Sequence, residues 1–554
     1  MKRKTVILCA AAAVVLLAAA AAGSKGFFRD PAYFMNRLQN KVTQKYHEIT
    51  KTEPQLQEEI IQTADHHKVL LDHPKGYSVS LPEDMSFDLS IAPEQIKAYR
   101  DGTTVVLTRE WAPYEDVFYM IDNYLNQYYL NEEYQAANRI TVSQNEKFTT
   151  AAGARAQLIT LHREPAEGST VTQNNYSYFF VESLTGKQAF FRMMFKSDNP
   201  QTLSAVVDEA VASFEEIPLK GGNVFHEDYA PVIPQNWNEE TKKLYRSIQS
   251  GKKFYWGLFV DGAYTDAKRY QWYDDLEKKV DFPFDFSLHY VNLNHGFPVE
   301  ELTKMYEEGK LTELTLQISY HANDNLFGKN INFDVYDGLC DDEIRAFAKG
   351  AKEFGHPFLF RLNNEMNSDW VNYSGVAALS DPEIFIENWR RIYRIFEEEG
   401  VDNAIWVFNP NAEDCPPCHW NSYISYYPGN EYVHIIGLTG YNTGTYYADL
   451  YHEKWRTFDE IYQEPYEKYM QVFSQFPFMI TEFASSSVGG DKAAWITDMF
   501  ASLKKYPNIR MALWWSSADY DMREEHYKTL ARPYWLDETD ETTAAFREGI
   551  QSYK

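Results

Sequence analysis

The sequence predicts an α/β protein: a (β/α)8 TIM barrel preceded by a smaller α+β domain and an N-terminal signal or anchor segment. The length of 554 residues corresponds to two to four domains at roughly 150 residues each. Hydrophobic residues make up 44% of the chain and charged residues 24%, an ordinary globular balance. From about residue 250 onward, short apolar runs alternate repeatedly with amphipathic helical patterns. This alternation predicts the barrel.

The first 24 residues have the pattern of an export signal. Lys2, Arg3 and Lys4 form a basic start, and an apolar run extends from Val6 to Ala22. Such a segment is typical of a cleaved secretory signal peptide. The run also reaches the short limit of a membrane-spanning helix, so an uncleaved signal anchor remains open. Either interpretation predicts a protein that is secreted or attached to the outer face of the cell membrane.

Two further regions precede the barrel. Residues 25–66 are predicted to form a helical stalk, because apolar residues recur in them at spacings of three and four. Residues 67–218 are predicted to form an α+β domain with an antiparallel sheet, and residues 219–249 a linker. We expect this domain to be a binding or spacer module without catalytic residues. Its predicted strands are Tyr77–Leu81, Thr103–Thr108, Ala154–Leu161, Tyr176–Val181 and Ala189–Phe195, and its predicted helices are Tyr114–Gln135 and Thr202–Phe214.

Residues 250–554 are assigned to the barrel. Most of the apolar runs are continuous rather than alternating, as expected of parallel strands covered on both faces. Helical patterns such as Asp342–Phe354 and Asp381–Glu399 lie between them. The eight predicted strands are Phe254–Val260, Phe284–Leu293, Glu313–Tyr320, Pro357–Leu362, Ala404–Phe408, Val433–Leu438, Pro477–Thr481 and Met511–Trp515.

Two glutamates stand at or just past the ends of predicted barrel strands. Glu365 follows the fourth strand and Glu482 follows the seventh, so we expect them to face each other across the barrel mouth. A lone glutamate at a strand end is usually a surface ion-pair residue. Two facing carboxylates, however, are what glycoside hydrolysis requires: one protonates the departing oxygen and the other stays ionised.

Residues 250–530 resemble glycoside hydrolase family 26, a clan A family of retaining (β/α)8 enzymes. Glu365 lies in a stretch similar to the family's acid/base motif, and Glu482 with Phe483 is similar to its nucleophile segment. Four other stretches resemble the family, one around the third strand, one around the fifth and two around the sixth. The matching residues are Arg361, Met366, Asn367 and Trp370, then Ile318–His321, Asp402–Phe408, Tyr427–Val433 and Gly437–Tyr441.

The resemblance implies catalytic roles for the two glutamates. Glu482 would be the nucleophile that forms a covalent glycosyl-enzyme, and Glu365 the general acid and then the general base. For this retaining route the carboxyl groups should lie about 5–5.5 Å apart. Glu365 needs a raised pKa, which apolar neighbours and the charge of Glu482 would supply.

Other positions are candidates for binding the substrate, each with a structural alternative. Tyr441 is placed to donate a hydrogen bond to Glu482, or it packs in the core. Asn364 is a candidate partner of the sugar 2-hydroxyl, or it caps a turn. Arg361 needs a carboxylate partner and contributes to the site or to a structural ion pair. His321 is expected either to bind sugar hydroxyls or to have a structural role. Of the two tryptophans at the end of the eighth strand, Trp514 and Trp515, we expect Trp515 to form the floor beneath the reactive sugar. Trp370 is a candidate wall of the cleft.

The chain departs from the family pattern near the site. Asn364 replaces the usual His, Ser368 replaces Gly, and His434 and Thr439 replace acidic residues. The resemblance favours β-1,4-mannan or glucomannan as substrate. A β-1,3-xylanase, a mixed-linkage glucanase, an exopolysaccharide hydrolase and an inactive glycan-binding barrel remain alternatives.

The composition and net charge of the chain limit the classes of molecule that it is expected to bind. The net charge of −27 opposes binding to nucleic acid, and the expected partner is a polysaccharide, with possible membrane attachment through the N-terminal segment. No cofactor and no metal are implied, because the 14 His residues show no zinc-like spacing. Cys415 and Cys418 are expected to form a short disulfide or to remain free thiols. The sequence leaves the oligomeric state open.

Overall fold

The computed structural model describes residues 58–63, 66–112, 116–319, 326–524, 526 and 528–553. The predicted signal or anchor segment, nearly all of the predicted stalk, and His321 lie outside these residues. The chain divides into two compact units. The first contains residues up to Ile121, Thr141–Glu164 and Thr172–Glu227. The second contains Asp122–Ile140, Pro165–Val171 and Asp228–Lys554.

The described residues of the first unit form two sheets and one long helix. A four-stranded sheet has the order β1-β2-β3-β11 and a seven-stranded sheet the order β4-β5-β6-β10-β9-β8-β7. Helix α5 (Pro200–Ser213) buries Leu203, Val206 and Val207 in the hydrophobic core of this unit. The strands are β1 (Glu58–Gln62), β2 (His67–Asp72), β3 (Tyr77–Pro82), β4 (Ser86–Asp88), β5 (Ile96–Arg100), β6 (Thr103–Trp111), β7 (Ile140–Thr149), β8 (Arg155–Arg163), β9 (Asn175–Glu182), β10 (Ala189–Ser197) and β11 (Glu215–Glu216).

Two predicted helical segments differ from the structure. Residues 58–62, placed in the helical stalk by their periodicity, form strand β1, which pairs antiparallel with β2. The predicted helix Tyr114–Gln135 is broken into α3 (Val117–Met120), the π-helical turn η2 (Ile121–Leu125) and α4 (Glu132–Ala137). Asn131 explains the break: its backbone is extended and its side chain accepts the N–H of Tyr134, which starts a new helix.

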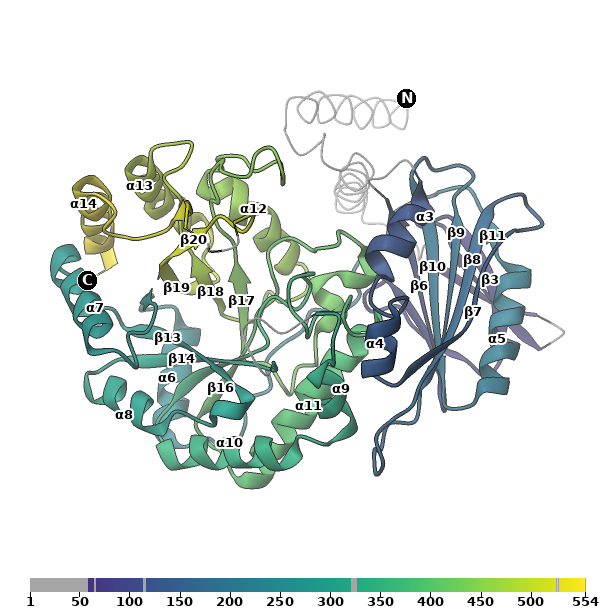
Figure 1. The fold of residues 1–554 in the computed structure, drawn as a ribbon, viewed down its shortest axis with the longest axis horizontal. Helices are drawn as coiled ribbons and strands as arrows, with labels where there is room; N and C mark the ends of the chain where they lie inside the picture. Colours follow the sequence, from purple (N-terminus) through teal and green to yellow (C-terminus); the bar gives the residue numbers. More distant parts are fainter. Residues whose placement is uncertain are drawn as a thin grey trace, which may run out of the picture. The chain divides into compact units, whose positions relative to one another are not determined.

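The second unit is a closed barrel of eight parallel strands in sequential order (Figure 1), which confirms the predicted fold class. Inward-facing side chains such as Leu288, Leu359, Val407 and Met479 fill its interior, so the barrel is packed rather than open. The strands are β12 (Tyr255–Val260), β13 (Phe286–Asn292), β14 (Leu311–Gln317), β15 (Phe358–Leu362), β16 (Ala404–Phe408), β17 (Ile435–Thr439), β18 (Phe478–Phe483) and β19 (Ile509–Ser516).

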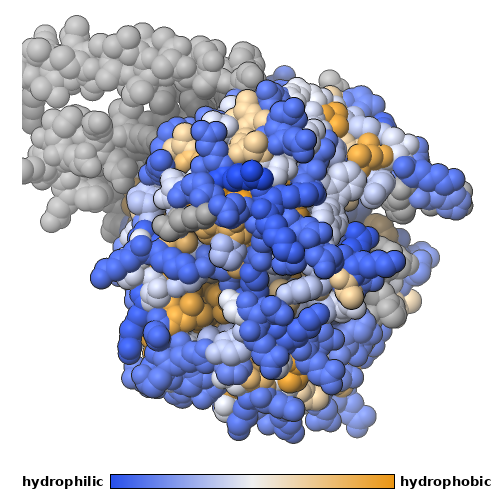
Figure 2. Space-filling model, turned by 90° about the vertical axis from the view of Figure 1, so that its left-hand side faces the viewer, coloured by the Kyte–Doolittle hydropathy of each residue, from blue (hydrophilic) through white to orange (hydrophobic). Residues whose placement is uncertain are grey.

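Amphipathic helices cover the barrel. The main ones are α6 (Glu239–Ser250), α7 (Ala267–Val280), α8 (Val299–Glu307), α9 (Ile331–Asp337), α10 (Asp341–Phe354), α11 (Pro382–Glu399), α12 (Phe458–Tyr469), α13 (Lys492–Ser502) and α14 (Asp540–Ile550). A two-stranded sheet of β20 (Ala518–Tyr520) and β21 (Leu530–Pro533) follows the last barrel strand. The face shown in Figure 2 is mostly hydrophilic, with apolar side chains in small separate patches. Within the described ranges, no helix is long and apolar enough to cross a membrane.

Candidate active site

Arg361 connects carboxylates from two barrel strands. It is the residue before the last of β15 and is fully buried, and its Nη2 is 2.6 Å from Oε1 of Glu482 on β18. Its Nε is 3.1 Å from Oε1 of Glu313 on β14 and donates to Thr315. A buried guanidinium needs anionic partners to offset the loss of its hydration. Arg361 is therefore fixed between the side chains of Glu313 and Glu482.

Glu482 accepts hydrogen bonds on both carboxylate oxygens. The hydroxyl of Tyr290 donates to Oε1 at 2.6 Å, and the hydroxyl of Tyr441 donates to Oε2 at 2.7 Å. Burial, followed by the charge of Glu482, holds the pKa of both tyrosines well above the ordinary value, so they remain protonated donors. Together with the ion pair to Arg361, these contacts orient the Glu482 side chain.

Glu365 stands three residues past the end of β15 on a sharply turned backbone. Its φ of 59° is in the left-handed region, and its N–H donates to the carbonyl of Asn409 at 2.7 Å. Burial first, and then the charge of Glu482, raise the pKa of Glu365 to about 8, whereas Arg361 lowers it. A carboxyl group with such a pKa carries a proton at neutral pH. Glu365 can thus donate a proton beside the hydrogen-bonded carboxyl group of Glu482.

The neighbours of Glu365 hold its surroundings in place. The side-chain oxygen of Asn364 accepts from Gln317 and Tyr373, both at 3.1 Å, and its nitrogen lies 3.5 Å from Oε2 of Glu365. Trp370 is the exposed member of this group, with 48% of its surface accessible, and its side chain hydrogen-bonds Glu365. An exposed indole beside a buried acid suits a cleft wall.

The two tryptophans at the end of β19 point to opposite sides. Trp514 is fully buried and its indole donates to the carbonyl of Tyr534. Trp515 faces the barrel interior, where its ring lies 6.0 Å from that of Tyr441 and 5.5 Å from that of Phe259. Trp515 therefore belongs to the same group of side chains as the tyrosine that contacts Glu482.

Two residues of this network were not expected from the sequence, namely Tyr290 and Glu313. Both lie on barrel strands in positions that point inward, and alternation along β13 and β14 is the signal that could have identified them. Glu313 is fully buried; burial, opposed by Arg361, raises its pKa to about 8.

Thr439 and His434, which replace acidic residues of the family, are both buried. The hydroxyl of Thr439 accepts a hydrogen bond from the side chain of Asn409, and the ring of His434 accepts one from the N–H of Trp406.

A segment from between β6 and β7 belongs to the barrel unit and supports the loops at its mouth. Residues 122–140 form part of that unit. The hydroxyl of Tyr124 donates to Asp369, four residues after Glu365, and Ser380 donates to the carbonyl of Leu125. Asn138 bonds to the backbone of the segment that follows β14. The loop that carries Glu365 is thus held partly by residues far from the barrel in sequence.

The cysteines of the described chain are free thiols. Cys340 and Cys418 are buried and Cys415 is partly buried. Of the two alternatives left open for Cys415 and Cys418, the structure has the free thiols. Among the residues that the structure describes, no group of three or more His, Cys, Asp or Glu side chains is arranged to hold a metal ion.

Parts of the chain are similar to known proteins. The model of glycosyl hydrolase family 26 matches residues 328–462. Endoglucanase H of Acetivibrio thermocellus is 31% identical over 222 residues, 39% of this chain and 23% of its own length. A mannan endo-1,4-beta-mannosidase of Bacillus subtilis is 28% identical over 192 residues, 33% of this chain and 46% of its own. The chain thus spans less than half the length of these relatives. The structure of a GH26 beta-mannanase from Bacteroides ovatus aligns over 57% of this chain and 94% of the mannanase chain. The sequence identity is 17% and the TM-score is 0.41.

Residues 328–462, which run from the segment after β14 into helix α12, are thus similar to glycosyl hydrolase family 26, and the matched segment contains Glu365.

Proposed function

We propose that the protein is a retaining endo-β-glycosidase that hydrolyses a β-linked polysaccharide through Glu365 and Glu482. One observation carries this proposal. The Glu482 side chain is held in place by Arg361, Tyr290 and Tyr441, while the pKa of Glu365 is raised to about 8 by burial and by the charge of Glu482. A fixed anion beside a protonated acid is the pair that a double displacement needs.

In the first step, Glu365 donates its proton to the glycosidic oxygen as the bond to the anomeric carbon breaks. An oxygen of Glu482 attacks that carbon and forms the glycosyl-enzyme ester. Glu365, now a carboxylate, then takes a proton from a water molecule, which attacks the same carbon and releases Glu482. Arg361 and the two tyrosines balance the changing charge of Glu482 throughout.

We propose β-1,4-mannan or glucomannan as the leading substrate. The names of the relatives support this proposal: two mannan endo-1,4-beta-mannosidases align with this chain over 192 and 250 residues, beside an endoglucanase. β-1,3-Xylan, mixed-linkage glucan and an exopolysaccharide remain alternatives, because Asn364 stands where the family has His. We further propose that the chain is exported, on the pattern of residues 1–24 alone.

A product screen with matched variants tests the proposal. Residues 25–554 are incubated with mannan, glucomannan, β-1,3-xylan and mixed-linkage β-glucan, beside E482A and E365A. We expect oligosaccharides from one polymer, no turnover by E482A, and slow turnover by E365A that recovers on aryl glycosides with good leaving groups. Equal loss by E365A on both substrate types would refute its role as the acid. Binding of a polymer without any products would indicate the inactive, glycan-binding alternative.

A further inference from the structure

Glu313 is a carboxyl group inside the barrel to which the proposed double displacement gives no part. It lies on β14, fully buried, and pairs in register with Leu288 of β13 and Leu359 of β15, two side chains of the hydrophobic core. Among the residues that the structure describes, neither oxygen of Glu313 has a hydrogen-bond partner. Burying a carboxyl group without hydrogen bonds is costly, so its contact with Arg361 decides its state.

Arg361 is the cation that Glu313 and Glu482 share. The Nε of Arg361 lies 3.1 Å from Oε1 of Glu313, and its Nη2 lies 2.6 Å from Oε1 of Glu482. One buried guanidinium can balance one carboxylate, so a second buried anion would be left without a counterion. Burial raises the pKa of Glu313 to about 8; Arg361 opposes this shift and the charge of Glu482 adds to it. At neutral pH Glu313 therefore carries a proton.

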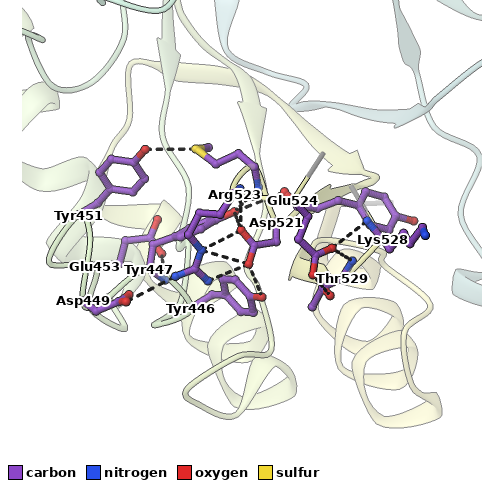
Figure 3. Close-up of polar contacts among 12 residues, drawn as sticks. Tyr446, Tyr447, Asp449, Tyr451, Glu453, Asp521, Arg523, Glu524, Lys528 and Thr529 are labelled. Atoms are coloured by element: carbon purple, nitrogen blue, oxygen red, sulfur yellow. Dashed lines mark hydrogen bonds and ion pairs between the residues drawn. The ribbon is translucent and has the colours of Figure 1, made fainter. Parts of the chain in front are cut away.

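Another arginine–carboxylate contact of the barrel unit shows what hydrogen bonds and solvent change (Figure 3). Asp521 accepts hydrogen bonds from Arg523 on both oxygens, at 2.9 and 2.8 Å, and from Tyr446 at 2.9 Å. These hydrogen bonds hold the pKa of Asp521 well below its ordinary range. The side chain of Arg523 is 45% exposed, whereas those of Arg361 and Glu313 are fully buried. A neighbouring guanidinium alone is thus not enough to keep Glu313 ionised.

The groups around Glu313 define how its proton affinity can change. Burial holds the pKa of Tyr290 on β13 and of Tyr264, in the segment after β12, above the ordinary value, so both hydroxyls stay neutral. Among the described residues, Arg361 on β15 and Glu482 on β18 are the charged groups that act on Glu313. Of these two, only Glu482 changes its charge in the proposed reaction, when its carboxylate becomes an ester. Loss of that charge removes a repulsion and leaves Glu313 beside Arg361.

We propose that Glu313 gives up its proton when Glu482 is esterified to the sugar, and that it then serves as the counterion that holds Arg361 in position. This inference rests on the proposed function. As an oxygen of Glu482 bonds to the anomeric carbon, the electron pair of the glycosidic bond leaves with the departing group, and the O–H proton of Glu313 passes to water. Hydrolysis of the ester restores the Glu482 carboxylate, and Glu313 takes a proton back. Glu313 is thus a positioning residue that acts through Arg361, because a buried guanidinium without an anion is costly.

The test counts protons while the ester forms. E365Q removes the other carboxyl group whose proton affinity depends on Glu482, and without its general base the glycosyl-enzyme accumulates. E365Q is mixed with dinitrophenyl β-mannobioside or β-cellobioside in weakly buffered solution at neutral pH. The burst of dinitrophenolate counts the ester, and an indicator dye counts the released protons. For a fall of about one to two pKa units from about 8, we expect about 0.4 to 0.8 proton per dinitrophenolate.

Two double variants identify the source of the proton. E365Q/E313Q should form the ester and release no proton, because the Gln side chain does not ionise. E365Q/E277Q is the matched control. Glu277 on α7 pairs with Lys310, which precedes β14 at the end of the barrel opposite the catalytic loops. Its proton release should equal that of E365Q.

Carbon-13 NMR of labelled glutamate tests the same change without replacing Glu313. In E365Q a glutamate signal that titrates near pH 8 belongs to Glu313, and in E365Q/E482Q we expect it to titrate at least about one unit lower. A burst without proton release, release that persists in E365Q/E313Q, or a pKa that stays near 8 in E365Q/E482Q would overturn the inference and leave the proposed function in place. A wild type that cleaves none of the polymers, together with no burst in E365Q, would refute both.

Discussion

The raised pKa of Glu365 predicts a measurable response to neutralising Glu482. In the folded protein the pKa of Glu365 is raised to about 8 by burial and by the charge of Glu482. The substitution E482Q keeps the shape of the side chain and removes its charge. We therefore expect the pKa of Glu365 to fall but to remain above 4.5, because the effect of burial persists.

The size of the fall follows from Coulomb's law. Two unit charges at the carboxyl separation of about 5.5 Å expected for a retaining enzyme, in an effective dielectric of about 20, interact by about 3 kcal/mol. At about 1.4 kcal/mol per pKa unit, this is about two units, so we expect a pKa near 6 for Glu365 in E482Q. The pKa of Glu365 should fall rather than rise, because removing a neighbouring anion makes the charged carboxylate easier to form.

Carbon-13 NMR of labelled glutamate measures this pKa directly, with E365Q used to assign the signal. In the active wild type, the same group sets the alkaline limb of the pH profile of kcat/KM, because the acid must be protonated. We expect that limb near pH 8. A pKa that stays near 8 in E482Q would refute the reasoning, since burial alone would then set the proton affinity of Glu365.

Two further predictions concern the residues around the glutamates. Y290F and Y441F each remove one hydrogen bond to the Glu482 carboxylate, at 2.6 and 2.7 Å, and we expect each to lower kcat by about tenfold or more, as for the loss of a bond to a charged group. Pre-steady-state kinetics would contradict this if both variants formed the glycosyl-enzyme at the wild-type rate. Y124F removes the hydrogen bond to Asp369 beside the acid loop, and we expect a larger loss on natural glycans than on aryl glycosides with good leaving groups. An equal loss on both would show that Tyr124 acts on folding alone.

The sequence predicted the barrel well because its signals are local. Continuous apolar runs such as Ala404–Phe408 and Pro357–Leu362 fall on β16 and β15, since strands buried on both faces cannot alternate. The positions of Glu365 and Glu482 at strand ends are also local, because chain order fixes which end of the barrel a loop belongs to. The stretch Tyr114–Gln135 was predicted less well, because one Asn cap divided a region of helical periodicity.

The composition and order of the chain therefore determined the fold class, the two glutamates and their strands. Only the tertiary structure showed that Tyr290 and Glu313 share a network with Arg361 and Glu482, because these residues come from four strands that only barrel closure brings together. The same holds for Tyr124, which lies 245 positions from its partner Asp369. The protonation state of Glu365 is likewise decided only by the tertiary structure. Its pKa is raised by burial and by a neighbouring charge, and both exist only once the chain is folded.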